Sequence, residues 1–119
     1  MLFRSGGVVA YAYEAKEHLL GVHHNTLYEH GAVSAPTAHE MARGVRREFG
    51  ADIGLAVTGI AGPTGGLPGK PVGTTWVALS ARSFERAEHY LWSGDRGTNK
   101  EESAEASLQL LLEYLQQPE

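Results

Sequence analysis

The chain has 119 residues, a formal net charge of -4, 42% hydrophobic and 20% charged residues, and no cysteine. These values fit one globular domain over residues 1–119 with a modest core, and they do not fit a disordered chain. The acidic balance argues against a nucleic-acid partner, and the missing cysteines exclude disulfides, thiolate metal sites and a cysteine nucleophile. No stretch has the length of a signal peptide or a membrane span, so we expect a cytoplasmic protein with no membrane partner.

The first half of the chain alternates one expected strand with helices. Residues 8–11 are apolar and β-branched, which predicts a buried strand. Residues 13–20 predict a helix closed by Gly21, and residues 25–30 a second short helix. Ser34 has the character of an N-cap, with Pro36 in the first turn of a third helix. The apolar face of that helix is formed by Ala38, Met41, Ala42, Val45 and Phe49.

The second half contains three expected strands and a closing helix. Residues 53–58 predict a covered strand, residues 72–80 a third strand, and residues 89–92 the end of a fourth that begins near Arg86 and forms a hairpin around Ser83. In the last helix, acidic side chains occupy the early turns. Its expected buried stripe is Ala104, Leu108, Leu111, Leu112 and Leu115. This order predicts an α/β fold, a three-layer α/β/α sandwich with a mixed sheet.

The segment between the second and third expected strands is rich in glycine and proline. Residues 59–73 contain six glycines and three prolines directly after a buried strand. Glycine permits positive φ and close approach of a ligand to backbone amides, and the loop after a strand of an open α/β sheet is a common ligand position. The segment matches neither a Walker loop nor the dinucleotide-binding fingerprint. Residues alone leave two readings, a ligand-contacting loop or an irregular turn between strands.

A cluster of three arginines and the six histidines could each have a functional or a structural role. Arg43, Arg46 and Arg47 lie on a predicted helix with acidic neighbours, which favours a solvated face over a phosphate-binding patch. The six histidines lack metal-ligand spacing, so we expect no metal and no cofactor.

Four motifs occur in the same order as in a known family. They are residues 6–11 with Glu14-Ala15-Lys16, residues 30–34, the glycine-rich segment 58–74 and the sequence Ser93-Gly94-Asp95-Arg96. Together they resemble the CinA C-terminal domain, or nicotinamide-nucleotide amidase, family over essentially the whole chain. The resemblance implies hydrolysis of the carboxamide of nicotinamide mononucleotide to nicotinate mononucleotide and ammonia, without a metal. It also implies a homo-oligomer.

The resemblance also implies roles for particular residues. Lys16 resembles the catalytic base, and Tyr11 the residue that orients the nucleophilic serine. The residues implied to form the substrate pocket are Thr58, Gly59, Ile60, Ala61, Gly62, Gly65, Gly66 and Arg96. A lysine acts as a base only when burial or positive charge lowers its pKa. The alternative is an exposed lysine held by the neighbouring glutamates.

The sequence departs from the family pattern at the nucleophile. The family's serine lies in a glutamate-serine-x-threonine-glycine-glycine motif that precedes residues 6–11, and the 119 residues contain no such motif. The family also has asparagine where this chain has Tyr13. We therefore expect a domain that lacks its first strand and helix, and impaired catalysis. A non-catalytic nucleotide-binding or oligomerising remnant is the alternative.

Overall fold

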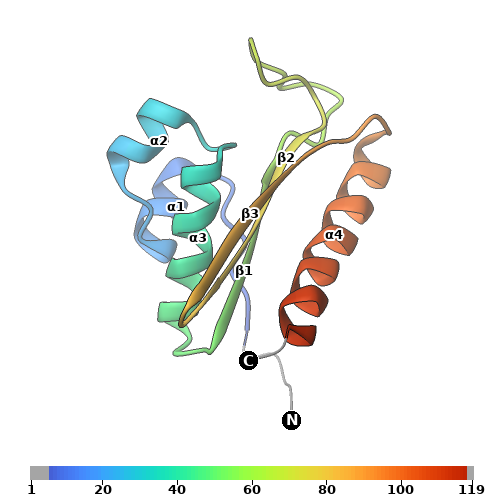
Figure 1. Cartoon of the computed structure of the whole chain (residues 1–119). Helices are drawn as coiled ribbons and strands as arrows, with labels where there is room; N and C mark the ends of the chain where they lie inside the picture. Colours follow the sequence, from blue (N-terminus) through green and yellow to red (C-terminus); the bar gives the residue numbers. More distant parts are fainter. Residues whose placement is uncertain (1–5, 118–119) are drawn as a thin grey trace.

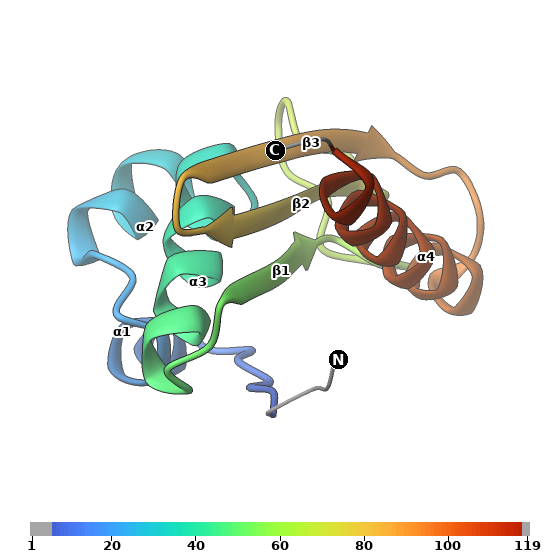
Figure 2. The ribbon, with the colours of Figure 1, turned by 60° about the horizontal axis from the view of Figure 1, so that its bottom comes forward.

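The computed structural model describes residues 6–117, which form three layers (Figure 1). Three helices lie on one side of a three-stranded sheet, the third of them packed directly against it, and one long helix covers the other face, as the turned view also shows (Figure 2). This confirms the α/β class. The elements in chain order are α1 (Tyr13–Leu20), α2 (His24–His30), α3 (Ala35–Glu48), β1 (Ile53–Gly59), β2 (Thr74–Ala81), β3 (Phe84–Leu91) and α4 (Arg96–Gln116).

The sheet has the order β1-β2-β3, and both strand pairs are antiparallel. In β1 and β2, Ile53 pairs with Ala81 at one end and Gly59 with Thr75 at the other. Ala81 also pairs with Phe84 across a tight hairpin, as expected around Ser83. Because β2 is central and covered on both faces, seven of its eight residues are buried, which fits a sequence of apolar and small hydroxyl residues without a charge.

The strand expected at residues 8–11 does not form, and that prediction is wrong. These residues pair with no strand, and Val9 and Tyr11 are 75% and 79% exposed. Val8 and Ala10 instead pack against the cluster beneath α1 and α3. Strand propensity is weak unless a neighbouring edge completes the hydrogen bonds. Without this strand, the described sheet is antiparallel and not mixed.

The helix ends agree with the sequence signals. Gly21 closes α1 in the left-handed region at φ 68°, where glycine carries no Cβ penalty. Ser34 caps α3, and its hydroxyl accepts a hydrogen bond from the Thr37 amide at 3.2 Å. The Thr37 hydroxyl donates to the Gly31 carbonyl at 2.7 Å, so the turn before α3 is fixed by side chains.

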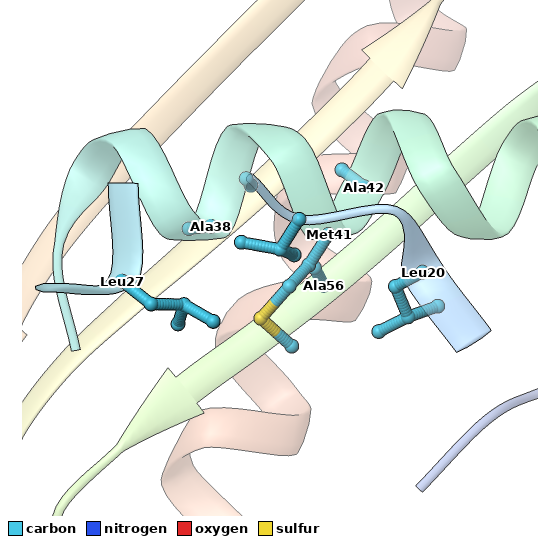
Figure 3. Packing of buried hydrophobic residues seen from close by; sticks show 8 residues of the cluster. Leu20, Leu27, Ala38, Met41, Ala42 and Ala56 are labelled. Atoms are coloured by element: carbon cyan, nitrogen blue, oxygen red, sulfur yellow. The ribbon is translucent and has the colours of Figure 1, made fainter. Parts of the chain in front are cut away.

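Two apolar clusters hold the layers together. One lies between α1–α3 and the sheet, where Leu20, Leu27 and Met41 meet Ala56 of β1 (Figure 3). The other lies between the sheet and α4, around Val77, Leu79 and Leu110. Alternate residues of β2 contribute to opposite clusters, because successive strand side chains point to opposite faces.

The buried face of α4 differs from the predicted stripe. Leu108, Leu112 and Leu115 are 62%, 47% and 41% exposed, Ala104 is also exposed, and Leu111 is only half-buried. The buried residues of α4 are Asn99, Ser103 and Leu110. The helix begins at Arg96, and polar groups of its first turns bond to the glycine-rich loop, which leaves Leu108, Leu112 and Leu115 facing outward. No helix within residues 6–117 has the length and apolar character needed to cross a membrane.

Candidate functional site: a cleft between the glycine-rich loop and the last helix

The glycine-rich segment is the connection from β1 to β2, and it extends beyond the end of the sheet (Figure 1). Its base is fixed by backbone bonds from the Ile60 amide to the Thr74 carbonyl, at 2.9 Å, and from the Gly73 amide to the Ile60 carbonyl, at 2.7 Å. Gly73 has φ 98°, and a Cβ there would lie 2.0 Å from the Trp92 carbonyl oxygen. Only glycine fits this position, because a side chain would clash with backbone.

Two side chains of α4 hold the start of the loop. Arg96 Nη1 donates to the Gly62 carbonyl at 3.0 Å, and Asn99 Nδ2 donates to the Ala61 carbonyl at 3.1 Å. The two residues are three apart, so they project from the same side of the helix. Asp95 caps α4, and its carboxylate accepts from the Thr98 amide at 2.8 Å. The predicted Ser-Gly-Asp-Arg motif is therefore the start of α4.

A cleft of about 310 Å³ opens between the loop and α4. Four residues predicted for the site line it: Tyr11, Gly59, Ala61 and Arg96. They come from the segment before α1, the end of β1, the loop and α4. The wall formed by α4 also presents Asn99, Lys100, Ser103 and Ala104. The cleft thus joins cationic side chains and backbone from segments far apart in the sequence.

Thr58 does not line this cleft. It is buried, and its hydroxyl donates to the Ala32 carbonyl at 2.6 Å. This bond joins the end of β1 to the turn before α3. Ile60, Gly62, Gly65 and Gly66 also lie outside the cleft wall. Gly62 is a buried residue of the loop with φ 89°, and its carbonyl accepts the hydrogen bond from Arg96.

Lys16 lies on α1 with only 6% of its surface exposed. Its Nζ donates to the Ala10 carbonyl at 2.7 Å, and burial lowers the pKa of the ammonium group. The alternative of an exposed lysine held by glutamates does not describe this arrangement, since Glu17 instead pairs with His24 at 2.8 Å. Lys16 is not part of the cleft wall. Its amine bonds to the carbonyl of Ala10, and the next residue, Tyr11, lines the cleft.

The residue that differs from the family pattern, Tyr13, does not contact the Lys16 amine through a hydrogen bond. Its ring packs edge-to-face on Tyr28, with ring centroids 5.5 Å apart. The Lys16 amine takes the Ala10 backbone carbonyl as its acceptor. The local bonding of Lys16 therefore does not depend on a side-chain amide at residue 13.

The arginines of α3 are engaged with the sheet. The Arg43 guanidinium pairs with the Glu85 carboxylate through contacts of 2.6 to 3.0 Å, and Arg46 donates to the Ser80 hydroxyl at 3.1 Å. The hydrogen bond from Arg43 lowers the pKa of Glu85 to about 2. Arg43 and Arg47 are exposed, as predicted for a solvated face, and Arg43 and Arg46 also bond to residues of β3 and β2. Within residues 6–117, no three His, Asp or Glu side chains gather to hold a metal.

Sequence reasoning missed the polar pair Asn99 and Ser103. Both are buried, and Ser103 accepts a hydrogen bond from Trp92 Nε1 at 2.9 Å. Asn99 and Ser103 are four residues apart, and Leu110 follows seven residues later. This spacing places the three residues on one face of the helix. The signal was present in the sequence, but the more numerous leucines defined a different face.

The fold and the loop–helix cleft define an α/β domain with a glycine-rich loop beside its last helix. The family model described as the CinA C-terminal domain matches residues 2–115, and the chain belongs to this family. A CinA-like protein of Salinibacter ruber is 50% identical over 104 residues, which are 87% of this chain and 25% of the relative. A CinA-like protein of Syntrophus aciditrophicus is 49% identical over 116 residues, 96% of this chain and 27% of the relative.

Solved structures show the same fold. A competence/damage-inducible protein from Agrobacterium tumefaciens matches with a TM-score of 0.87 at 36% identity, covering 90% of this chain and 66% of that one. A competence or damage-inducible protein from Enterobacter asburiae matches with a TM-score of 0.87 at 39% identity, covering 92% and 69%. The chain thus spans about a quarter of its curated relatives and about two thirds of these solved chains.

Proposed function

We propose that residues 6–117 form the nucleotide-binding part of an amidase site for nicotinamide mononucleotide. The reaction adds water to the carboxamide and gives nicotinate mononucleotide and ammonia. The observation that carries this proposal is the cleft at which Tyr11, Gly59, Ala61 and Arg96 meet. The resemblance implied these residues from separate motifs, and they line one cleft.

The charges of the cleft suit an anionic nucleotide. Arg96 and Lys100 supply positive charge at the wall formed by α4. The loop contributes the backbone of Gly59 and Ala61, which a planar ring can approach closely because the side chains are small. In this proposal the phosphate lies toward Lys100 and the pyridine ring toward the loop.

The proposed base is Lys16. Amide hydrolysis by acyl transfer needs a nucleophile, a base that removes its proton and donors for the oxyanion. Burial favours the neutral amine of Lys16, which is the form that accepts a proton. The Lys16 amine bonds to the carbonyl of Ala10, so it lies beside the segment that contributes Tyr11 to the cleft.

The nucleophile in this proposal is a serine that the 119 residues do not supply. Ser103 lines the cleft, but its hydroxyl already donates to the Asn99 carbonyl at 2.8 Å and accepts from Trp92. A hydroxyl so engaged is not positioned to attack an amide. We therefore propose that these 119 residues by themselves bind the nucleotide without turning it over.

The test uses the 119-residue chain in two assays. Titration calorimetry with nicotinamide mononucleotide is expected to show saturable binding, with nicotinamide riboside as the ligand that lacks the phosphate. Ammonia release is expected to stay at background. No binding of the mononucleotide would overturn the proposed function, and turnover abolished by Lys16→Ala would overturn the missing-nucleophile argument.

We also propose that the chain forms a homo-oligomer through the outer edge of β1. This edge pairs with no described strand, and between Ile53 and Gly59 it carries no charge, whereas the opposite edge, β3, carries Glu85, Arg86 and Glu88. Charged residues discourage edge-to-edge pairing. A second copy can pair with β1 and cover the exposed leucines of α4. Light scattering that shows a monomer at high protein concentration would contradict this proposal.

We further propose a cytoplasmic location, without a nucleic-acid or membrane partner.

A further inference from the structure

Asn99 joins three parts of the site. Its Nδ2 donates to the Ala61 carbonyl in the glycine-rich loop at 3.1 Å, and its Oδ1 accepts from the Gly94 amide at 3.1 Å. Its backbone amide donates to the Asp95 carbonyl at 2.8 Å at the start of α4. The residue is 2% exposed. One buried side chain therefore connects the loop, the turn after β3 and the last helix.

The chemistry of this position requires an amide. A buried polar side chain is costly unless both of its polar ends have partners, and both ends of Asn99 do. A carboxylate at residue 99 could accept from Gly94 but could not donate to Ala61. An apolar side chain would leave both backbone groups without their partner. The pairing of one donor with one acceptor is therefore specific to the neutral amide.

The Asn99 bond acts beside a second one. Arg96 holds the next carbonyl, that of Gly62, at 3.0 Å. Two consecutive carbonyls of the loop are thus fixed from a single turn of α4. Arg96 is an exposed residue and Asn99 a buried one, so the side chain that holds Ala61 is the less accessible of the two to water.

We propose that Asn99 is the positioning residue of the glycine-rich loop. By holding the Ala61 carbonyl, it fixes the spacing between the loop wall of the cleft, Gly59 and Ala61, and the helical wall that carries Lys100. The effect that we expect on nucleotide affinity rests on the proposed function. The effect on the order of the loop in the free protein is independent of that function, because the hydrogen bonds that fix the loop are internal to the chain.

The experiment compares Asn99→Asp with Asn25→Asp. Asn25 is exposed on α2, so the second variant carries the same charge change away from the site. Hydrogen exchange of the ligand-free protein, expressed as protection relative to intrinsic rates, is measured for loop residues 60–73 and for β2. At pH 7 we expect Asn99→Asp to lower loop protection at least about tenfold and to leave β2 protected, because local opening of a loop does not require global unfolding. Asn25→Asp is expected to change neither.

A pH series adds a readout that simple loss of packing would not produce. Burial raises the pKa of a carboxyl group, and the protonated acid can again donate to Ala61. Loop protection of Asn99→Asp should therefore recover as the pH falls from 7 toward 5. Unchanged loop protection at pH 7, or lost protection with no recovery at lower pH, overturns the proposal.

Two further measurements keep the outcomes separate. If Asn99→Asp lowers protection in β2 as well, Asn99→Ala, which adds no charge, is measured in its place. Loss of protection in the loop alone supports the proposal. Equal loss in the loop and in β2 overturns it. Affinity for nicotinamide mononucleotide should fall about tenfold in the variant whose loop is loosened. If the wild-type chain does not bind the nucleotide, the proposed function fails, while loop exchange still decides the role of Asn99.

Discussion

Gly44 in the middle of α3 offers a test in which helix propensity and tertiary packing predict opposite signs. Replacing an interior helical glycine by alanine stabilises an isolated helix by about 1 kcal/mol. In this structure Gly44 is buried, and a Cβ there would lie 1.7 Å from the Leu20 carbonyl oxygen and 2.6 Å from its carbon. The close atoms are backbone at the end of α1, which cannot rotate away as a side chain would.

The expected result of Gly44→Ala is a net loss of stability. Overpacking of a core costs about 1 to 3 kcal/mol, and a backbone clash of this size belongs at the upper end of that range. Subtracting about 1 kcal/mol of helix propensity leaves a loss of about 2 kcal/mol. Urea denaturation should show this as a lower midpoint with an unchanged slope.

Gly97→Ala is the matched control. Gly97 lies in the first turn of α4, and its added Cβ would meet only an Asp95 carboxylate oxygen, at 3.6 Å. We expect this variant to be slightly more stable than the wild type, by up to about 1 kcal/mol. A Gly44→Ala protein as stable as the wild type, or more stable, would refute the assignment of a backbone contact between α1 and α3.

Two further predictions concern the sheet and the last helix. Glu85 has its pKa lowered to about 2, chiefly by the hydrogen bond from Arg43, so its contribution to stability is complete above the ordinary value of 4.5 and is lost as the pH falls from about 4.5 toward 2. Because the pair is partly exposed, Glu85→Gln should cost only about 1 kcal/mol at pH 7 and almost nothing at pH 2, and an equal difference at both pH values would contradict the pairing. Leu110→Ala, at a side chain 2% exposed, should cost about 2 to 4 kcal/mol in thermal or urea unfolding. Leu108→Ala, at a side chain 62% exposed, should cost less than about 0.5 kcal/mol when the protein is dilute. A larger loss of stability for Leu108→Ala than for Leu110→Ala would contradict the structure and support the buried stripe predicted from the sequence.

The sequence predicted the connection between β1 and β2 better than the contacts of individual side chains. The residues alone leave the glycine-rich segment open between a ligand-contacting loop and an irregular turn, and the structure shows it as the link from β1 to β2. The family resemblance, against the alternative of an exposed lysine, implies a base that needs burial at Lys16, and Lys16 is buried. Thr58 was assigned to the substrate, yet its hydroxyl bonds to Ala32, 26 residues earlier in the chain. Such a partner is set by the packing of β1 against the turn before α3, which no local pattern encodes.

The strand at residues 8–11 and the stripe of α4 failed for a related reason. Apolar composition indicates that a segment can be buried, but burial needs a neighbour. Val9 and Leu108 are both mostly exposed. Leu108 lies near the outer edge of β1, since Leu108 and Val57 line one groove.

The sequence by itself determined the α/β class, the helix caps, the hairpin around Ser83 and the family, because each depends on local residue types at short spacing. The tertiary structure decided which residues meet. It placed Tyr11, Ala61 and Arg96 around one cleft, buried the amine of Lys16, and made Asn99 the connection between loop and helix. The physical reason is that caps and turns are satisfied within a few residues of chain. The cleft is formed by residues up to 93 positions apart, from Tyr11 to Ala104, and only the packing of the layers brings them together.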